Sequence, residues 1–339
     1  AQSLRVPFET FTLPNGLTVL MHEDHSVPIV TVNQWYHVGS GDEKPGRTGF
    51  AHLFEHVMFM GSQNVPYGKF DQSLEAAGAD NNGSTTEDRT NYFESGPSNV
   101  VPLALWLDAD RMGWLLPTMD QQKLDAQRDV VKNERRQGVD NVPYGLADET
   151  ILAALYPKGH PYSWPVIGSM ADLSAASVDD VKEFFRMYYA PNNSTMVIAG
   201  DVRPDSVKAW MTKYCGDVPR NPSAPTRAQV TPVTLAKDTT LVLEDKVQLP
   251  RIFYTWPTMP AFHPDEAPLD HFADILGGNE SSRLYRRLVY EMQIAQDVAA
   301  YNQCGKIAGV FQIVATPAPG HAPAEVAKVI DEEVKKALD

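Results

Sequence analysis

The stretch TGFAHLFEHVMFMG, residues 48–61, carries two histidines and a glutamate at the spacing of a metal-binding helix. On a helix, His52 and His56 lie one turn apart, and Glu55 falls on the same side, within about 100°. Apolar residues fill the opposite side: Phe50, Leu53, Phe54, Val57 and Met58. Such a helix can bury one face and present two imidazoles and a carboxylate to a cavity.

The order His-x-x-Glu-His is the inverse of the commoner zinc-peptidase order His-Glu-x-x-His. Two neutral imidazoles one turn apart can bind one zinc ion, which leaves the glutamate free to take a proton from water. Thr48 is the expected N-cap of the helix, and Gly61 is its expected end. Two core or surface histidines could stand at this spacing by chance, but the amphipathic, capped context favours a metal site.

The composition is that of an ordinary globular protein without a basic surface. The chain has 339 residues, with 43% hydrophobic residues, 21% charged residues and a net charge of −14. This length is sufficient for two domains. The negative charge argues against nucleic-acid binding, which needs basic residues to contact phosphates. No apolar run reaches the roughly 18 residues of a membrane span.

The cysteines and the first residue bear on the compartment. Cys215 and Cys304 form no Cys-x-x-Cys pair, and the sequence leaves open whether they form a disulfide. The chain starts at Ala1 rather than at methionine, as a processed protein would. We therefore expect a mature exported protein, periplasmic or secreted, with the mitochondrial matrix or the cytoplasm as alternatives.

Hydrophobic periodicity predicts alternating strands and helices. Residues 11–38 are expected to form a hairpin with a turn at Asn15–Gly16. Neither a Rossmann nor a P-loop glycine pattern is present, so an α+β arrangement of helices layered on a sheet is expected. Further strands are expected over residues 79–97 and 194–202, and helices over 69–79, 102–114, 121–137, 142–156, 178–189 and 204–214.

Prolines divide the chain into two predicted domains. The proline-rich residues 217–236 are expected to link a zinc-bearing domain, residues 1–216, to a second domain, residues 237–339. The second domain repeats the element types without the metal motif, as a duplicated and incomplete copy would. Its strands are expected over residues 239–245, 251–257 and 310–318, and its helices over 268–278, 281–292 and 326–338.

Catalytic zinc takes three protein ligands and keeps one open position, so a third ligand must come from elsewhere in the chain. Glu134 lies in the second half of the helix expected over residues 121–137. Spacing alone does not choose it over Glu87, Glu94 or Glu149. Glu134 could equally be a surface acid paired with a basic residue.

The motif AHLFEHVMFMGS followed by Glu134 resembles the pitrilysin or insulinase family of zinc peptidases, in the branch with mitochondrial processing peptidase and its bacterial relatives. The resemblance implies that His52, His56 and Glu134 bind one Zn²⁺ per chain, and that Glu55 is the general base. Similar segments follow in the family's order between about residue 8 and residue 291: NGLTVLMHEDHSVPIVTVNQWYHVGSGDE, NNGSTTEDRTNYFES, RDVVKNERRQ, HPYSWPVIGS, YYAPNNSTMVIAGDV and ESSRLYRRL.

The same resemblance implies how substrate is held. Residues 81–85 are similar to the family's edge strand, to which an extended peptide adds through main-chain hydrogen bonds. A simple core strand is the alternative. The strand residues are Asn81, Asn82, Gly83, Ser84 and Thr85. Family members are clamshells of two similar halves, so we expect half of a clamshell, with two homologous domains of helices on mostly antiparallel sheets.

Two departures from the family pattern bear on activity. Gln127 stands where a second acid often precedes the ligand glutamate. Val289 and Gln296 stand where active single-chain relatives carry an arginine and a tyrosine that hold the substrate carbonyl. Arg283, Arg286 and Tyr290 are nearby but at the wrong spacing. A second homologous half or a partner subunit is therefore expected to supply the Arg/Tyr pair.

Three hypotheses follow. The first is a zinc endopeptidase that cleaves peptides or small unfolded polypeptides inside a closed chamber, with Glu55 activating water. The second is a non-catalytic scaffold of the same fold that needs or supports a partner. The intact set of His52, Glu55, His56 and Glu134 favours the first. A zinc hydrolase of another fold that shares the motif by chance is the third, and the other similar segments argue against it.

Overall fold

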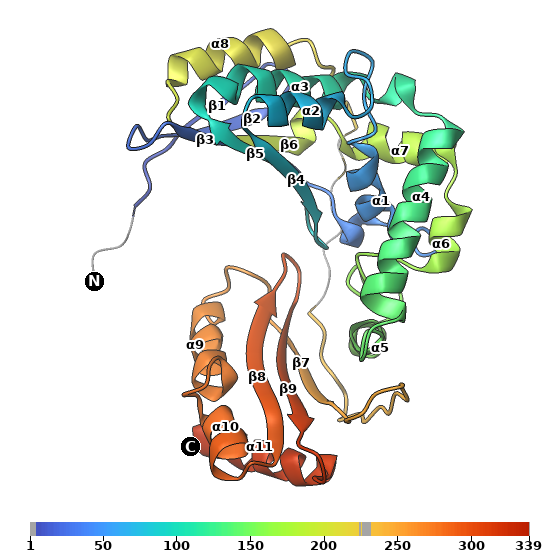
Figure 1. The fold of residues 1–339 in the computed structure, drawn as a ribbon, viewed down its shortest axis with the longest axis vertical. Helices are drawn as coiled ribbons and strands as arrows, with labels where there is room; N and C mark the ends of the chain where they lie inside the picture. The colour runs from blue at the N-terminus through green and yellow to red at the C-terminus, as the bar shows by residue number, and fades with distance from the viewer. Residues whose placement is uncertain (1–4, 224, 226–231, 339) are drawn as a thin grey trace. The chain divides into compact units, whose positions relative to one another are not determined.

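The computed structural model describes residues 5–223, 225 and 232–338, which form two compact units (Figure 1). Each unit has a hydrophobic core of its own. Within the predicted linker, residues 224 and 226–231 lie outside the described residues. The first unit comprises residues 5–135 and 164–223, and the second comprises residues 136–163 and 232–338.

The boundary between the units differs from the one that the prolines predict. Residues 136–163 are expected in the first domain, but in the structure they cluster with the second unit. The reason is a small buried core in which Leu155, Tyr156 and Tyr162 pack with Ala308. Sequence periodicity does not reveal this packing, because it joins segments far apart in the chain.

The first unit is built on a six-stranded sheet with the order β1-β2-β6-β3-β5-β4. β2 and β6 are parallel, whereas the other neighbouring strands are antiparallel. The mostly antiparallel sheet expected from the sequence is therefore confirmed. The strands are β1 (Glu9–Thr12), β2 (Thr18–Glu23), β3 (Ile29–Tyr36), β4 (Asp80–Thr85), β5 (Thr90–Pro97) and β6 (Ser194–Gly200).

The hairpin predicted over residues 11–38 is only partly correct. β1 and β2 do pair across the Asn15–Gly16 turn, where Gly16 takes a φ of 95°. β2 and β3 do not pair, because β6 lies between them and bonds to both. Val30, Val32 and Tyr36 of β3 are buried, and this alternation determines which face of the strand packs on the core. It does not determine which strand pairs with β3.

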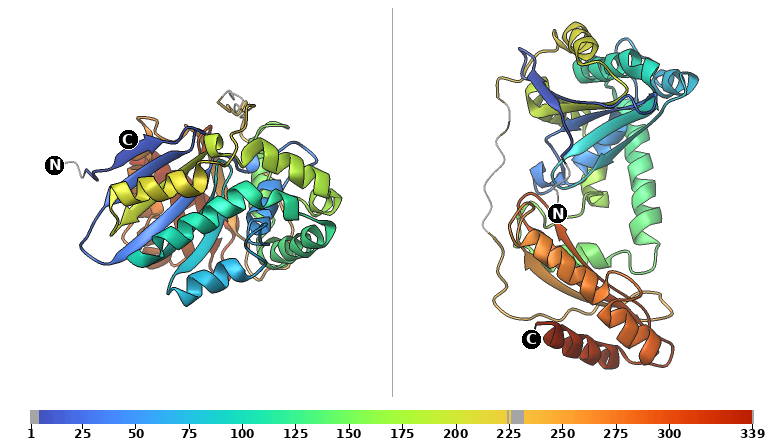
Figure 2. Two further views of the ribbon diagram at one scale, coloured as in Figure 1. Left: turned by 90° about the horizontal axis from the view of Figure 1, so that it is seen from above. Right: turned by 90° about the vertical axis from the view of Figure 1, so that its left-hand side faces the viewer.

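Helices α3 and α8 lie side by side across one face of this sheet (Figure 2). α1, α4, α6 and α7 gather at one end of the unit (Figure 1). The short α6 escapes the sequence prediction, although Ser169 caps it by accepting the amide hydrogen of Asp172. The helices are α1 (Phe50–Val57), α2 (Lys69–Ala76), α3 (Val101–Trp114), α4 (Gln121–Arg135), α6 (Met170–Ala175), α7 (Val178–Tyr188) and α8 (Pro204–Cys215).

The N-cap predicted for α1 is wrong. The capping position is Gly49, with a φ of 86°, and the Thr48 hydroxyl instead donates to Asp172 at 2.6 Å. The buried carboxylate of Glu43 takes the role of the cap, because it accepts the amide hydrogens of Gly49 at 3.0 Å and Ala51 at 2.8 Å. Free amide groups at a helix start need such acceptors. α1 ends at Val57, before the predicted Gly61.

The second unit has a three-stranded antiparallel sheet with the order β7-β9-β8. α9, α10 and α11 contribute to the core on one face of it. α10 continues as a π-helix over Arg286–Glu291, and a second π-helical turn spans Arg136–Asp140. The elements are β7 (Ile252–Thr258), β8 (Ala295–Cys304), β9 (Gly309–Pro317), α5 (Ala147–Leu155), α9 (Glu266–Gly277), α10 (Arg283–Tyr285) and α11 (Pro323–Leu338).

Two predictions for the second unit are wrong, and one of its strands is missed. Residues 239–245 form no strand, since no partner strand for them exists among the described residues, and Val242 is 87% exposed. The helix predicted from residue 142 begins only at Ala147, because Tyr144 takes a φ of 62°. β8 lacks a clear alternation and is missed.

The two units share a topology. In both, a strand, two helices and an antiparallel pair of strands follow one another, with the orders β3-β5-β4 and β7-β9-β8. α1 and α2 in the first unit thus correspond to α9 and α10 in the second. The predicted fold class, two related units of helices on mostly antiparallel sheets, is confirmed. Among residues 5–223, 225 and 232–338, no helix combines the length and apolar character needed to cross a bilayer.

Candidate metal centre

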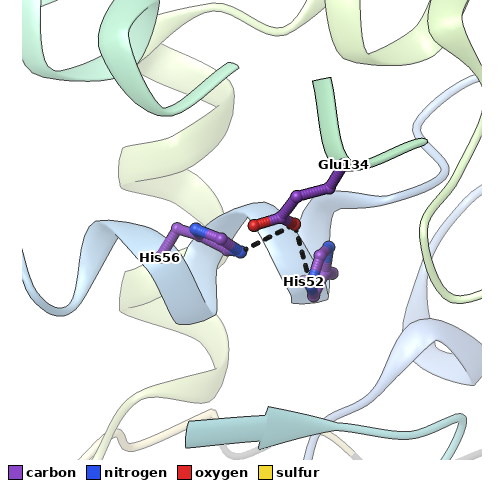
Figure 3. A group of neighbouring side chains, drawn as sticks. All are labelled: His52, His56 and Glu134. Atoms are coloured by element: carbon purple, nitrogen blue, oxygen red, sulfur yellow. Dashed lines mark ion pairs between the residues drawn. The ribbon is translucent and has the colours of Figure 1, made fainter. Parts of the chain in front are cut away.

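Three side chains from two helices meet at one point of the first unit (Figure 3). The carboxylate Oε2 of Glu134 lies 3.3 Å from Nε2 of His56 and 3.8 Å from Nε2 of His52. The two imidazole rings lie edge to face, with centroids 4.8 Å apart. Potential ligand atoms of all three residues fall within 4.8 Å of one another.

Helix packing brings Glu134 to the histidines. α4 runs against α1 and contributes Leu124 and Val131 to the core of the unit. Asp120 caps the start of α4 by accepting the amide hydrogen of Lys123 at 2.9 Å. At the other end, Arg135 donates to the carbonyl of Gly168 at 2.7 Å. Hydrogen bonds therefore hold both ends of the helix that carries Glu134.

The donor set fits zinc. Two imidazole nitrogens and a carboxylate oxygen are ordinary ligands for it, and tetrahedral bonds of about 2.0–2.1 Å place ligand atoms about 3.3–3.5 Å apart. The distances from Glu134 to His56 and His52, 3.3 and 3.8 Å, are close to that spacing. Burial, together with the neighbouring His56, lowers the pKa of His52 to about 4. His52 is thus neutral at pH 7, as a ligand must be.

Glu55 lies beside this group but bonds elsewhere. Its Oε2 accepts a hydrogen bond from the Thr85 hydroxyl at the end of β4. Burial raises the pKa of Glu55, and the Thr85 hydrogen bond opposes that shift. A carboxylate whose pKa is raised is a stronger base and takes up a proton more readily.

The other acids considered as third ligands lie outside the group that the described residues form. Glu94 is buried against Arg111 at 2.8 Å. Glu149 belongs to α5 of the second unit. Glu87 follows β4 in the turn toward β5. The structure therefore brings Glu134, and none of these three, to His52 and His56.

Residues 81–85 belong to β4, which ends the strand order of the sheet. Within the described part of the chain, β4 pairs with β5 alone, so one of its edges is free. Gly83 and Thr85 face Glu55. The strand predicted to bind substrate is therefore an edge strand beside the metal site.

Several residues singled out in the sequence have other partners. Gln127 donates to the sulfur of Met60 at 2.7 Å. Val289 packs against the core of the second unit, whereas Gln296 is exposed. Cys215 and Cys304 are free thiols. The three residues at the wrong spacing bind carboxylates. Arg283 forms an ion pair with Glu333, Arg286 forms one with Glu291, and the Tyr290 hydroxyl donates to Glu280.

Two contacts of the site were not predicted. Neither follows from spacing: the Glu43 cap of α1 depends on the course of the loop just before the helix, and the bond from Thr85 to Glu55 joins two elements that the tertiary structure brings together. The threonine-rich run STT at residues 84–86 is compatible with a strand but does not indicate a partner for either hydroxyl.

Comparisons with known proteins identify the family of the chain. The family model described as "Insulinase (Peptidase family M16)" matches residues 18–165, and the model described as "Peptidase M16 inactive domain" matches residues 175–339. The zinc protease PqqE of Helicobacter pylori is 30% identical over 343 aligned positions, which cover all of this chain and 76% of that protein.

Solved structures show the same similarity. A protease from Helicobacter pylori superposes with a TM-score of 0.91 at 28% identity, over 97% of this chain and 79% of that one. The first half of the periplasmic protease PqqL from Escherichia coli shares the fold, with a TM-score of 0.69 at 19% identity over 92% of this chain and 68% of that one. Sequence, site geometry and similarity together show that the chain belongs to the insulinase family of peptidases, family M16.

Proposed function

We propose that this chain is a zinc-dependent endopeptidase that cleaves peptides or small unfolded polypeptides. The observation that carries the proposal is the convergence of His52, His56 and Glu134 within 4.8 Å, with Glu55 on the same helix as the histidines. Relatives named zinc proteases support the assignment at the level of the family. His52, His56 and Glu134 would hold one zinc ion per chain.

Bound zinc would supply a positive charge that polarises the scissile carbonyl. Glu55 would act as the general base, taking a proton from the attacking water and then giving it to the leaving amine. Its Oε2 is held by Thr85. Removing the Glu55 carboxylate leaves the three proposed ligands in place, so zinc binding and turnover are expected to respond separately.

Substrate would add to the free edge of β4. An extended peptide can pair with the main chain of residues 81–85 and become a further strand of the sheet. Main-chain pairing is tolerant of side chains, so the selectivity for sequence is expected to be broad. It requires an extended chain, which favours peptides and unfolded polypeptides over folded proteins.

A second half or partner subunit would complete the site and close the chamber. Val289 has no side-chain donor and Gln296 offers only a neutral amide, so neither supplies the charge of an arginine, and the neighbouring Arg286 and Tyr290 are paired with Glu291 and Glu280. The similarity to the first half of PqqL supports a two-part assembly. We therefore expect an arginine and a tyrosine from that second part to stabilise the developing oxyanion.

A non-catalytic scaffold is the second candidate. The family model that matches residues 175–339 is described as an inactive domain, which favours it. That description covers the C-terminal part, whereas His52, Glu55, His56 and Glu134 all lie N-terminal to it. A scaffold would not need a complete set of ligands together with a base.

Cleavage of a quenched fluorogenic peptide separates the two candidates. We expect the zinc-loaded chain, co-expressed with its completing half, to cleave the peptide, to lose activity with a chelator and to regain it with zinc. Glu55→Gln is expected to keep stoichiometric zinc and lose turnover. Zinc binding without cleavage in the complete assembly would support the scaffold instead.

The compartment is a separate part of the proposal. We place the protein in the periplasm, the location printed for PqqL of Escherichia coli. Fractionation of cells into periplasm and cytoplasm tests this placement. Recovery of the protein in the cytoplasmic fraction would contradict it.

A further inference from the structure

We propose that Thr85 is a positioning residue for Glu55: its hydroxyl fixes the carboxylate of the base relative to the strand that binds substrate. The inference rests on the proposed peptidase function and deepens it. Nothing in the pattern His-x-x-Glu-His requires it, because Thr85 belongs to a different element. A hydrogen bond, a close approach and a strand pairing support this role.

The hydrogen bond joins Thr85 Oγ1 to Glu55 Oε2. An ionised carboxylate can only accept, so the threonine hydroxyl is the donor. The neighbouring Thr90 Oγ1 is 3.5 Å from Thr85 Oγ1, and because Thr90 donates its own proton to the carbonyl of Val38 at 2.9 Å, it can only accept from Thr85. At 3.5 Å this neutral hydroxyl is a much weaker acceptor than the Glu55 carboxylate, so the Thr85 proton is directed to Glu55.

Gly83 bounds the second oxygen of the same carboxylate. A Cβ at Gly83 would lie 3.1 Å from both Cγ and Oε1 of Glu55. The strand thus passes in contact with the side chain of the base. Thr85 holds one oxygen and Gly83 leaves room for the other. This arrangement restricts rotation of the carboxylate, and among the described residues it leaves Oε1 without a protein donor.

The end of β4 that carries Thr85 is itself held firmly. Thr85 pairs with Thr90 on β5. The guanidinium of Arg89 donates to the carbonyl of Ser84 at 2.9 Å and to the side chain of Asn91 at 2.7 Å. It also lies over the ring of Trp35, 5.1 Å from the centroid. A hydroxyl on such a braced turn can hold the carboxylate in one orientation.

The consequence is a fixed geometry between base and substrate. The strand whose free edge would take up the peptide is the strand that orients Glu55. A peptide aligned on β4 is then aligned with the base through a single hydroxyl. The loss of this hydroxyl should disturb the chemical step more than it disturbs peptide binding.

A merely structural role for Thr85 makes a different prediction. Threonine favours strands, and valine has nearly the same shape and an equal preference for strands. If Thr85 only supports the sheet, Thr85→Val should be tolerated and Thr85→Ser should be the worse variant. If the hydroxyl positions Glu55, the order is reversed.

Steady-state kinetics of the zinc-loaded assembly test this order. We expect Thr85→Val to lower kcat by about 10- to 100-fold, with KM and zinc affinity within about twofold of wild type, and Thr85→Ser to recover most of the loss. Thr31→Val is the matched control, because Thr31 lies on β3 of the same sheet and its hydroxyl bonds to Ser95 at 2.9 Å. A valine variant with wild-type kcat would overturn the proposal.

A second measurement needs no catalysis. In the zinc-free chain, the shifts of the urea midpoint caused by Thr85→Val, by Glu55→Ala and by both together form a double-mutant cycle. We expect a combined shift smaller than the sum of the single shifts, because both variants break the same bond. Additive shifts would contradict the contact. If the wild-type assembly fails to cleave peptides, the proposed function is wrong, and the cycle still decides whether Thr85 holds Glu55.

Discussion

Of the three proposed zinc ligands, Glu134 alone comes from outside α1. The substitution Glu134→Gln keeps the shape of the side chain and removes its charge. We expect zinc affinity to fall by about 10-fold or more, since a ligand carboxylate becomes a poor neutral donor. Competition with a chromophoric chelator measures this affinity.

A control for this variant is available on the same helix. Asp129 is an exposed acid of α4. Asp129→Asn makes the same chemical change away from the histidines, so zinc affinity should stay at the wild-type value. Equal affinities for the Glu134 variant and the wild-type protein would assign the third ligand to another residue.

Arg111 is the centre of a buried cluster of charged and aromatic side chains in the first unit. Its guanidinium is buried, donates to both Glu94 and Asp108, and lies over the rings of Phe70 and Tyr92. Burial raises the pKa of both carboxyl groups. One arginine can balance one carboxylate, so the pair is expected to share a proton in the folded state.

The substitution Arg111→Met should therefore destabilise the protein by about 3–5 kcal/mol, because it leaves buried carboxyl groups without their cation. Urea unfolding at neutral pH measures the loss. Arg47→Met provides the comparison: the Arg47–Asp180 pair, at 3.3 Å, is on the surface and should contribute less than about 1 kcal/mol. Similar losses for the two variants would argue against the special role of the buried pair.

At the scale of elements, the N-terminus of α1 is capped by a side chain that lies outside the helix. Glu43 accepts the amide hydrogens of Gly49 and Ala51 with its two carboxylate oxygens. In Glu43→Gln, the amide nitrogen would face one of these donors. We expect a destabilisation of about 1–3 kcal/mol, accompanied by weaker zinc binding. Unfolding and zinc titration measure the two effects, and an unchanged variant would show that the cap is dispensable.

The edge strand β4 makes a prediction about substrates. If a peptide pairs with the main chain of residues 81–85, N-methylation of a peptide nitrogen that faces β4 removes one hydrogen bond. We expect kcat/KM to fall by about 2- to 10-fold from that bond alone, and further from steric conflict. N-methylation of the adjacent residue, whose amide points away, serves as the control. Equal effects at both positions would argue against strand addition.

The elements also show which features of the fold and the site local sequence patterns can predict. The spacing of His52 and His56 predicts their shared face because both lie within one helix. Glu134 could be chosen only by family resemblance, since its position depends on the packing of α4 against α1. The hairpin error has the same origin: β6, which follows most of the unit in sequence, inserts between β2 and β3. Local periodicity does not encode such neighbours.

On the scale of the whole molecule, two units of related topology differ in chemistry. α9 occupies the place of α1 in the second unit, but it buries Ala273 and Leu276 and carries a single histidine, His271. The duplication was predictable from the repeated element types. The grouping of residues 136–163 with the second unit was not, because the buried contacts of Tyr156 and Tyr162 with Ala308 join distant segments.

The proposed function depends on a zinc ion bound by His52, His56 and Glu134. X-ray absorption at the zinc edge, measured on the purified zinc-loaded chain, tests it directly. We predict one zinc per chain with two imidazole nitrogens at about 2.0–2.1 Å and oxygen in the remaining positions. A chain that takes up no zinc, or one whose zinc spectrum is unchanged in the double variant His52→Ala and His56→Ala, would contradict the assignment.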